Sequence, residues 1–248
     1  FKAPSFWKRV LPDTYDYYQF EGGKIYLKLK ESWPMMAQIS GNWEPQKLEF
    51  LREHVRPDTV FVDIGGAQGY FSLLAAHFAG DQGSVHIFEP HPTNADCIRK
   101  SIAANGYQSI HLHEMALGAE SGTIDLQVGQ MSFFHSIKTT NPYNSSESVS
   151  VPLRRADEVL SAAGVTHIDI MKIDVEGAEL DVLAGMPNTL AANPNLLLLI
   201  DIHPNIGVDA RELAELVGQY GFQLYQTKPP FAKIDPVPAN LKEALVKR

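Results

Sequence analysis

Cysteine is almost absent from this chain of 248 residues, with Cys97 as the single instance. One cysteine excludes an intrachain disulfide and excludes a zinc site built from several cysteines. The composition therefore predicts a reducing compartment and a cytoplasmic location.

Long apolar runs are also missing. The longest purely aliphatic run covers residues 196–200, far short of the roughly 20 residues that span a bilayer. We therefore expect a soluble protein with no membrane partner. The first residue is Phe rather than Met, which leaves open a targeting or anchoring segment upstream.

The chain also lacks an excess of positive charge. The 21 Lys and Arg residues face 29 Asp and Glu residues, which gives a formal net charge of -8 and a pI near 5.6. A partner with a phosphate backbone needs clustered basic side chains, so the charge argues against nucleic acid. A small-molecule or glycan partner fits better, while the oligomeric state stays open.

Residues 60–78 carry the most informative pattern in the chain. Apolar positions lead into Asp63, three glycines follow at 65, 66 and 69, and the apolar spacing then becomes helical. This order predicts a buried strand, a tight turn and an amphipathic helix. Such a turn lets a ligand approach backbone N–H groups at the start of a helix.

The same alternation continues along the chain and predicts an α/β protein. Further strands are expected at residues 84–88, 110–113, 168–173, 196–200 and 222–226, with helices around residues 95–102, 157–163, 178–183 and 210–217. Consecutive β-α-β units indicate a mostly parallel, Rossmann-like sheet flanked by helices. We expect an N-terminal extension over residues 1–40, with a strand at 24–29, and one domain over residues 41–248. The proline-rich tail allows either a final antiparallel strand or a short helix.

Residues 118–153 break this pattern with short alternating pieces. Within them, residues 131–147 show no period, which is typical of a binding loop or lid. Phe133 and Phe134 could form a wall for an acceptor or part of the core. His135 could contact a substrate, although a lone loop histidine usually has no function.

Glu89 ends the second predicted strand, twenty residues after Gly69, where a carboxylate can accept both hydroxyls of an adenosine ribose. Dinucleotide dehydrogenases and S-adenosylmethionine enzymes share this geometry. A dinucleotide turn would need glycines where Ala67 and Tyr70 stand. Asp63 suits the ammonium of a methionine moiety and would repel a phosphate. These residues favour S-adenosylmethionine over a dinucleotide. An NAD-dependent oxidoreductase and a non-catalytic cofactor-binding module are the alternative functions.

Several motifs occur in an order that resembles the FkbM family of S-adenosylmethionine-dependent methyltransferases. The run from Asp63 to Gly69 resembles motif I of class I methyltransferases, and residues 168–185 resemble the family hallmark; the Trp43-Glu44-Pro45, Phe88-Glu89-Pro90, Met115-to-Gly118 and Asp201-Ile202-His203 segments also match. The segment Gly66-Ala67-Gln68 departs from the family pattern. The resemblance implies a class I fold with a seven-stranded sheet, and methyl transfer to a hydroxyl of a sugar, glycan or secondary metabolite. The cofactor-binding residues that it implies are Asp63, Gly65, Gly66, Gly69, Tyr70, Glu89, Pro90, Met115 and Asp174.

An alcohol is a poor nucleophile at neutral pH, so the transfer calls for a general base or a metal. His203 is our candidate base, with Asp174 and Lys172 as further catalytic candidates; a histidine that only bonds backbone before Pro204 is the equal alternative. Magnesium at Asp174 and Asp201, by analogy with catechol O-methyltransferase, is allowed but not favoured. Separately, His111 and His113 lie two apart, which indicates an exposed strand face more than a metal site.

Overall fold

The computed structural model describes residues 13–29, 36–37, 39–42, 44–129, 135–137 and 144–248. Our predictions for Trp43, Phe133 and Phe134 lie outside the described residues.

Helices and strands alternate along most of the chain. The strands are β1 (Tyr15–Phe20), β2 (Gly23–Lys28), β3 (Val60–Ile64), β4 (Ser84–Phe88), β5 (Ile110–His113), β6 (Ala116–Leu117), β7 (Gly122–Gly129), β8 (Asn144–Arg154), β9 (Ile170–Ile173), β10 (Leu197–Asp201), β11 (Gln223–Tyr225) and β12 (Glu243–Lys247). The helices are α3 (Pro45–His54), α4 (Tyr70–Ala79), α5 (Pro92–Asn105), α6 (Ala156–Ala162), α7 (Glu179–Ala184), α8 (Pro187–Ala192) and α9 (Ala210–Gly218), with 3-10 turns at Gly80–Gln82 and Pro204–Ile206.

The main sheet has seven strands in the order β11-β12-β10-β9-β3-β4-β5. Neighbours from β10 to β5 are parallel, whereas β12 runs antiparallel to both β10 and β11. The predicted class I methyltransferase fold with a mostly parallel seven-stranded sheet is confirmed. The tail that the sequence left undecided forms the antiparallel strand, which enters between two strands that precede it in the chain.

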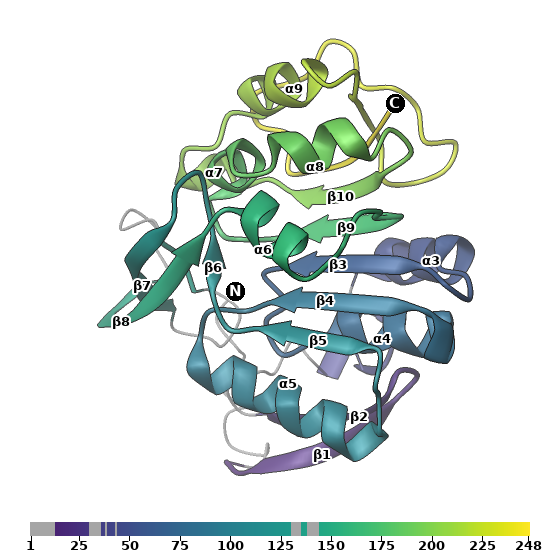
Figure 1. Cartoon of the computed structure of the whole chain (residues 1–248), viewed down its shortest axis with the longest axis vertical. Coiled ribbons are helices and arrows are strands. Elements are labelled where there is room, and N and C mark those ends of the chain that lie inside the picture. The colour runs from purple at the N-terminus through teal and green to yellow at the C-terminus, as the bar shows by residue number, and fades with distance from the viewer. Residues whose placement is uncertain (1–12, 30–35, 38, 43, 130–134, 138–143) are drawn as a thin grey trace.

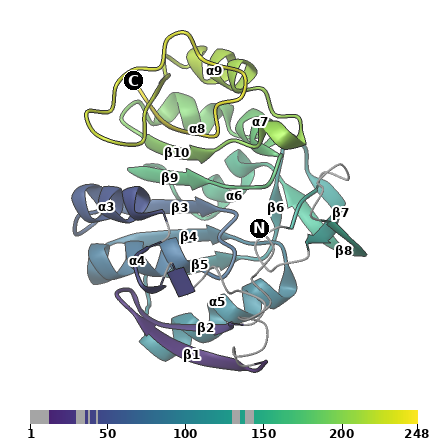
Figure 2. The ribbon, with the colours of Figure 1, turned by 180° about the vertical axis from the view of Figure 1, so that it is seen from behind.

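Helices cover both faces of this sheet (Figures 1 and 2). Alternate strand residues supply the two cores, because successive side chains of a strand point to opposite faces. Phe61, Ile87 and Ile170 face α3, α4 and α5. Val62 and Met171 face the helices α6 to α9 on the other side.

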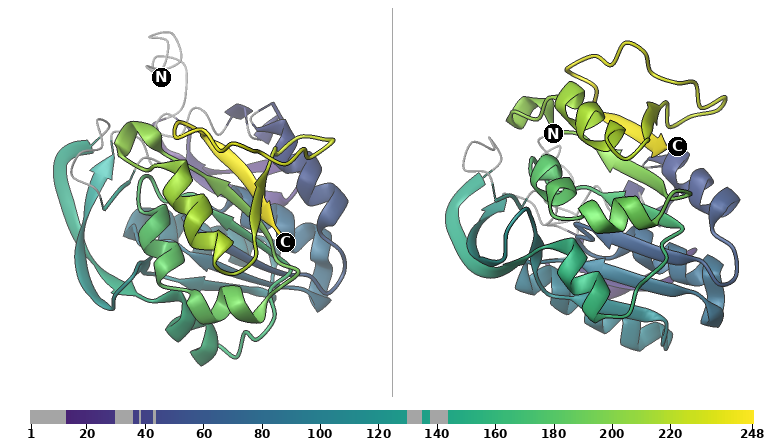
Figure 3. Two further views of the ribbon diagram at one scale, coloured as in Figure 1. Left: turned by 90° about the horizontal axis from the view of Figure 1, so that it is seen from above. Right: turned by 45° about the horizontal axis from the view of Figure 1, so that its top comes forward.

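A second sheet of three strands, in the order β6-β8-β7, stands beside the carboxyl ends of the main strands (Figure 3). We call β7, β8 and the described residues 135–137 the arm. Residues 136 and 127 are joined by a pair of backbone hydrogen bonds of 2.8 and 3.2 Å, which attaches 135–137 to β7. The prediction of an irregular stretch over residues 131–147 is wrong at its end, because β8 already begins at Asn144. The first residues of β8 are polar, so the sequence pattern did not indicate a strand there. The strand forms because its backbone pairs with β7.

Two further elements differ from the prediction. The helix expected around residues 178–183 is confirmed as α7, but a second helix that the sequence did not predict, α8, follows it after Gly185, with Pro187 at its first position. The N-terminal extension contains a hairpin of β1 and β2, of which only the second strand was predicted. This hairpin lies on α5, where the Asn105 side chain bonds both the N–H and the carbonyl of Lys24. The domain boundary at residue 40 stays a prediction.

Candidate active site

The glycine turn lies between β3 and α4, at the carboxyl edge of the sheet. Gly65 has φ +82°, and a Cβ built on it would lie 1.9 Å from the carbonyl oxygen of Asp174. A Cβ on Gly66 would lie 2.4 Å from Cγ2 of Ile87. Glycine is needed at both positions because neighbouring strands approach the turn too closely for a side chain.

The Glu89 carboxylate ties this turn to the end of β4. It accepts hydrogen bonds from the backbone N–H of Ala67 at 2.8 Å, the backbone N–H of His91 at 2.9 Å and the side chain of Asn94 at 3.3 Å. Burial raises the pKa of Glu89 to about 8, although these three donors favour the charged form. Glu89 therefore holds the glycine turn and the start of α5 together.

A pocket opens beside the turn, with an empty volume of about 570 Å³ that includes open solvent. Five of the predicted cofactor-binding residues line it: Gly65, Glu89, Pro90, Met115 and Asp174. The arm closes another side with Leu126, His135 and Ile137. Sequence reasoning did not connect these arm residues with the cofactor, because nothing local in residues 122–137 indicates what the arm will face.

Other predicted cofactor residues lie outside the described lining of this pocket. Tyr70 packs its ring against Phe20 at 5.4 Å and Phe71 at 5.1 Å, which gives it a place in the core instead. Gly66 and Gly69 belong to the turn but do not line the pocket. Gly69, with φ +87°, is the residue at which the turn passes into α4.

Asp63 is buried beneath the turn, 1% exposed. Its Oδ2 accepts a 2.5 Å hydrogen bond from Ser72, and its Oδ1 lies 3.9 Å from Nζ of Lys172. Among the described residues, Oδ1 has no hydrogen-bond partner. Burial raises the pKa of Asp63, while Lys172 and the Ser72 hydroxyl oppose this. Asp63 does not line the pocket and its nearest described cation is Lys172, so its predicted contact with the ammonium of a methionine moiety stays a prediction.

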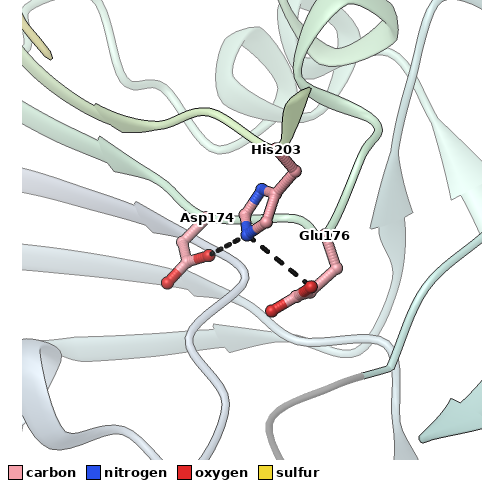
Figure 4. A group of neighbouring side chains, drawn as sticks. All are labelled: Asp174, Glu176 and His203. Carbon is pink, nitrogen blue, oxygen red and sulfur yellow. Dashed lines mark ion pairs between the residues drawn. The ribbon is translucent and has the colours of Figure 1, made fainter. Parts of the chain in front are cut away.

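Next to the pocket, His203 meets a group of carboxylates (Figure 4). Its Nε2 lies 3.6 Å from Glu176 and 3.9 Å from Asp174, two residues that also line the pocket. Its Nδ1 makes a 2.5 Å hydrogen bond with Oε1 of Glu179, which is fully buried at the start of α7. The structure thus brings together two of the predicted catalytic residues, His203 and Asp174, and adds Glu176 and Glu179.

These neighbours change the protonation of the group. Burial would lower the pKa of His203, but the hydrogen bond with Glu179 and the charges of Asp174 and Glu176 outweigh it and raise the pKa to about 9. Burial raises the pKa of Glu176 to about 8. Burial acts the same way on Asp174, yet Lys172, His203 and Lys47 together hold its pKa down to about 2. Without a ligand, His203 is therefore mostly protonated at neutral pH.

Lys172, the third predicted catalytic residue, is 4% exposed and lies behind this group. Its Nζ is 3.2 Å from Asp174 and 5.4 Å from the ring centre of Phe71. Burial opposes its charge, but Asp174 and Asp63 outweigh burial and raise the pKa of Lys172. The position suits a charge that holds the two aspartates in place, and a catalytic role for Lys172 stays a prediction.

Lys47 on α3 is a site residue for which the sequence carried no signal. Its Nζ lies 2.5 Å from Asp201 and 2.7 Å from Glu44, and its side chain is 2% exposed. Burial would lower the pKa of Lys47, but these two carboxylates outweigh it and raise the pKa. Lys47 is already paired with Asp201, so the magnesium pair of Asp174 and Asp201, which the sequence allowed but did not favour, does not form a metal site in the described part of this structure. Ligand atoms of Asp174, Glu176 and His203 lie within 4.8 Å of one another and could hold a metal ion.

His111 and His113 lie on β5 away from this group and belong to a stack with His86. The Nδ1 of His86 lies 3.2 Å from Nε2 of His113, and its ring centre is 4.8 Å from that of His111. His111 is exposed, whereas burial lowers the pKa of His113. The expected exposed face is thus correct for His111, and His113 is half-buried.

The comparisons with known proteins agree with this geometry. A sequence profile of the Methyltransferase FkbM domain matches residues 63–224, more than half of the chain. Hexuronic acid methyltransferase AglP of Haloferax volcanii is 25% identical over 205 residues, which cover 75% of this chain and 80% of AglP. The 2-O-methyltransferase NoeI of Sinorhizobium fredii is 29% identical over 149 residues, which cover 54% of this chain and 60% of NoeI.

Among solved structures, the methyltransferase FkbM from Methylobacillus flagellatus KT superposes with a TM-score of 0.48 at 15% identity, covering 85% of this chain and 52% of that one.

None of the helices in the described part of the chain is both long and apolar enough to cross a membrane. The family assignment decides against the NAD-dependent oxidoreductase. The chain belongs to the FkbM methyltransferase family and is a methyltransferase.

Proposed function

We propose that this protein transfers a methyl group from S-adenosylmethionine to a hydroxyl of a sugar, a glycan or a secondary metabolite. One observation carries the proposal: a histidine hydrogen-bonded to a buried carboxylate lies beside a pocket that a tight glycine turn borders. The names of the relatives, a hexuronic acid methyltransferase and a 2-O-methyltransferase, support an oxygen acceptor on a sugar. A small-molecule or glycan partner is part of this proposal.

The residues present fit S-adenosylmethionine. Gly65 lets the turn lie against the Asp174 carbonyl at the edge of the pocket, Glu89 offers carboxylate oxygens at the pocket wall, and Met115 and Leu117 supply an apolar surface that suits a base. S-adenosylmethionine, when bound, supplies a methyl group on a sulfonium, which an in-line nucleophile can displace. Much of the rate enhancement can then come from alignment of the acceptor by this chain.

His203 is suited to receive the proton of the acceptor hydroxyl. The hydrogen bond with Glu179 holds the proton of the neutral ring on Nδ1, so that Nε2 presents its lone pair toward the pocket-lining carboxylates. A pKa of about 9 makes this nitrogen a strong base, but only about 1% of it is unprotonated at pH 7. General-base catalysis by His203 would therefore become faster as the pH rises.

A divalent cation at Asp174, Glu176 and His203 is the alternative way to activate the hydroxyl. Carboxylate oxygens suit magnesium, whereas an imidazole ligand suits a transition metal better. Turnover that EDTA abolishes and an added divalent cation restores would support this alternative. Turnover that EDTA leaves unchanged would favour the metal-free base.

The proposal is tested by calorimetry with S-adenosylhomocysteine, followed by turnover with labelled S-adenosylmethionine on a panel of hydroxyl acceptors. Micromolar binding and label transfer to oxygen are expected. A folded protein that does not bind S-adenosylhomocysteine would contradict the proposal. Binding without label transfer to any acceptor would instead support a non-catalytic cofactor-binding module.

A further inference from the structure

His135 belongs to the arm and lines the pocket. It is far from the glycine turn in sequence, but both lie at the same pocket. The pocket surfaces near it are mostly apolar and suit a flat base: Met115, Ala116, Leu117, Leu126 and Ile137. None of these side chains can form strong hydrogen bonds with a base. His135 is thus the polar group that the arm brings to this part of the pocket.

The backbone N–H of Gly129 determines which nitrogen of His135 carries the proton. It donates a 3.0 Å hydrogen bond to Nδ1, and a donor can bond only a ring nitrogen that has a lone pair. Burial, with a smaller effect from His91, lowers the pKa of His135 to about 3, so the ring is neutral at physiological pH. The remaining proton therefore lies on Nε2.

The Nε2–H of His135 is buried and has no hydrogen-bond partner in the described ranges of the chain. A buried donor without an acceptor costs free energy, which a structure normally avoids. A ligand in the pocket can supply the missing acceptor.

The ring of His135 is also held in place. It stacks on His91 with ring centres 3.9 Å apart and planes 15° apart, and the His91 backbone is bonded to Glu89. The next residue, Ser136, is 1% exposed and donates a 2.5 Å hydrogen bond to the carbonyl of Glu176. His135 is therefore fixed relative to both the ribose-binding carboxylate and the catalytic group.

We infer that the Nε2–H of His135 donates a hydrogen bond to a ring nitrogen of the adenine base, and that the arm thereby selects the base of the cofactor. The inference rests on the proposed function, because it takes S-adenosylmethionine as the ligand of this pocket. Adenine carries acceptor nitrogens at N1, N3 and N7, and the donor on His135 complements one of them. An alternative contact, from His135 to the methyl acceptor, is an outcome of the test.

Calorimetry compares S-adenosylhomocysteine binding by the wild-type protein, His135→Phe and the matched control His77→Phe on the exposed side of α4. Phenylalanine keeps a flat ring for His91 but removes the donor, so about tenfold weaker binding is expected for His135→Phe only. Equal binding by wild type and His135→Phe overturns the inference, as does a change confined to the KM of the methyl acceptor. No binding by the wild type overturns the proposed function as well, which distinguishes the two failures.

A second measurement is decided on the wild type, so its main outcome does not depend on whether His135→Phe folds. The wild type is titrated with the 1-deaza, 3-deaza and 7-deaza analogues of S-adenosylhomocysteine, in which one ring nitrogen at a time becomes a C–H group. One analogue should bind about tenfold more weakly than the parent, and His135→Phe should not distinguish that analogue from the parent. Equal affinity of the wild type for all three analogues and the parent overturns the inference.

Discussion

His203 and Glu179 form a hydrogen bond of 2.5 Å between Nδ1 and Oε1, and the carboxylate is fully buried. The second oxygen of Glu179 has no hydrogen-bond partner among the residues described. The same Oε1 also accepts a 3.1 Å hydrogen bond from the backbone N–H of Gly177, and the imidazole is the side chain that bonds this buried carboxylate. This relationship makes Glu179 a positioning residue for His203.

Glu179→Gln should reduce turnover at least tenfold and leave S-adenosylhomocysteine affinity within about twofold. The amide removes the charge that raises the pKa of His203 and can also present an N–H to Nδ1, which favours the wrong tautomer. The apparent pKa of turnover should therefore fall below that of the wild type. The matched control is Glu212→Gln on the exposed face of α9. A pH profile that does not move would argue for a purely structural Glu179.

Wild-type turnover should rise with pH between 7 and about 9. The base must be unprotonated, and the pKa of His203 is raised to about 9. His203→Asn should lose a factor of about 10² to 10⁴ in kcat. Its residual rate should lack the rise, while S-adenosylhomocysteine still binds. Initial rates at saturating substrate across pH 6 to 10 check this, and a wild-type rate that is flat over the range would remove His203 as the base.

Stability should have the opposite dependence on pH. The pKa of His203 is higher in the folded protein, about 9, than its ordinary value of 6.5. The folded state therefore binds the proton more tightly, and this stabilisation is complete below pH 6.5 and is lost as the pH rises through 9. It amounts to at most about 3 kcal/mol. Urea unfolding at pH 6 and pH 9.5 should show a smaller loss of stability for His203→Asn than for the wild type; equal losses would show that other groups dominate.

Gly65→Ala should destabilise the protein by about 3 kcal/mol or more and abolish S-adenosylhomocysteine binding. The φ of +82° costs about 1 kcal/mol for alanine, and the Cβ would meet the Asp174 carbonyl at 1.9 Å, which forces β3 and β9 apart. Gly106→Ala is the matched control, since Gly106 also has positive φ, +70°, but the described structure has no atom within 4 Å of its Cβ. Similar losses in the two variants would mean that the close approach at Gly65 is unimportant.

Lys47→Met should destabilise the protein by about 3 kcal/mol, because it leaves Asp201, whose side chain is 16% exposed, without its ion-pair partner. The exposed pair of Lys100 and Asp96 on α5 provides the control, and Lys100→Met should change the midpoint of urea unfolding very little. Chemical denaturation of the two variants and the wild type gives the comparison. A small effect of Lys47→Met would indicate that Asp201 is protonated or hydrated when unpaired.

The local pattern of the sequence determined the strand-turn-helix unit around Gly65, the place of Glu89 at the end of β4 and the family. These follow from periodicity, turn chemistry and motif order, which are properties of neighbouring residues. The same information predicted the parallel sheet and most of its strands.

Only the tertiary structure decided which distant residues meet. Lys47 pairs with Asp201 across 154 positions, and β12 enters the sheet between β10 and β11, which both precede it. The tertiary structure also places Tyr70 in the core and His135 of the arm in the lining of the pocket. Contacts of this kind leave no periodic signal, because they depend on strand pairing and packing between elements that the chain order does not specify.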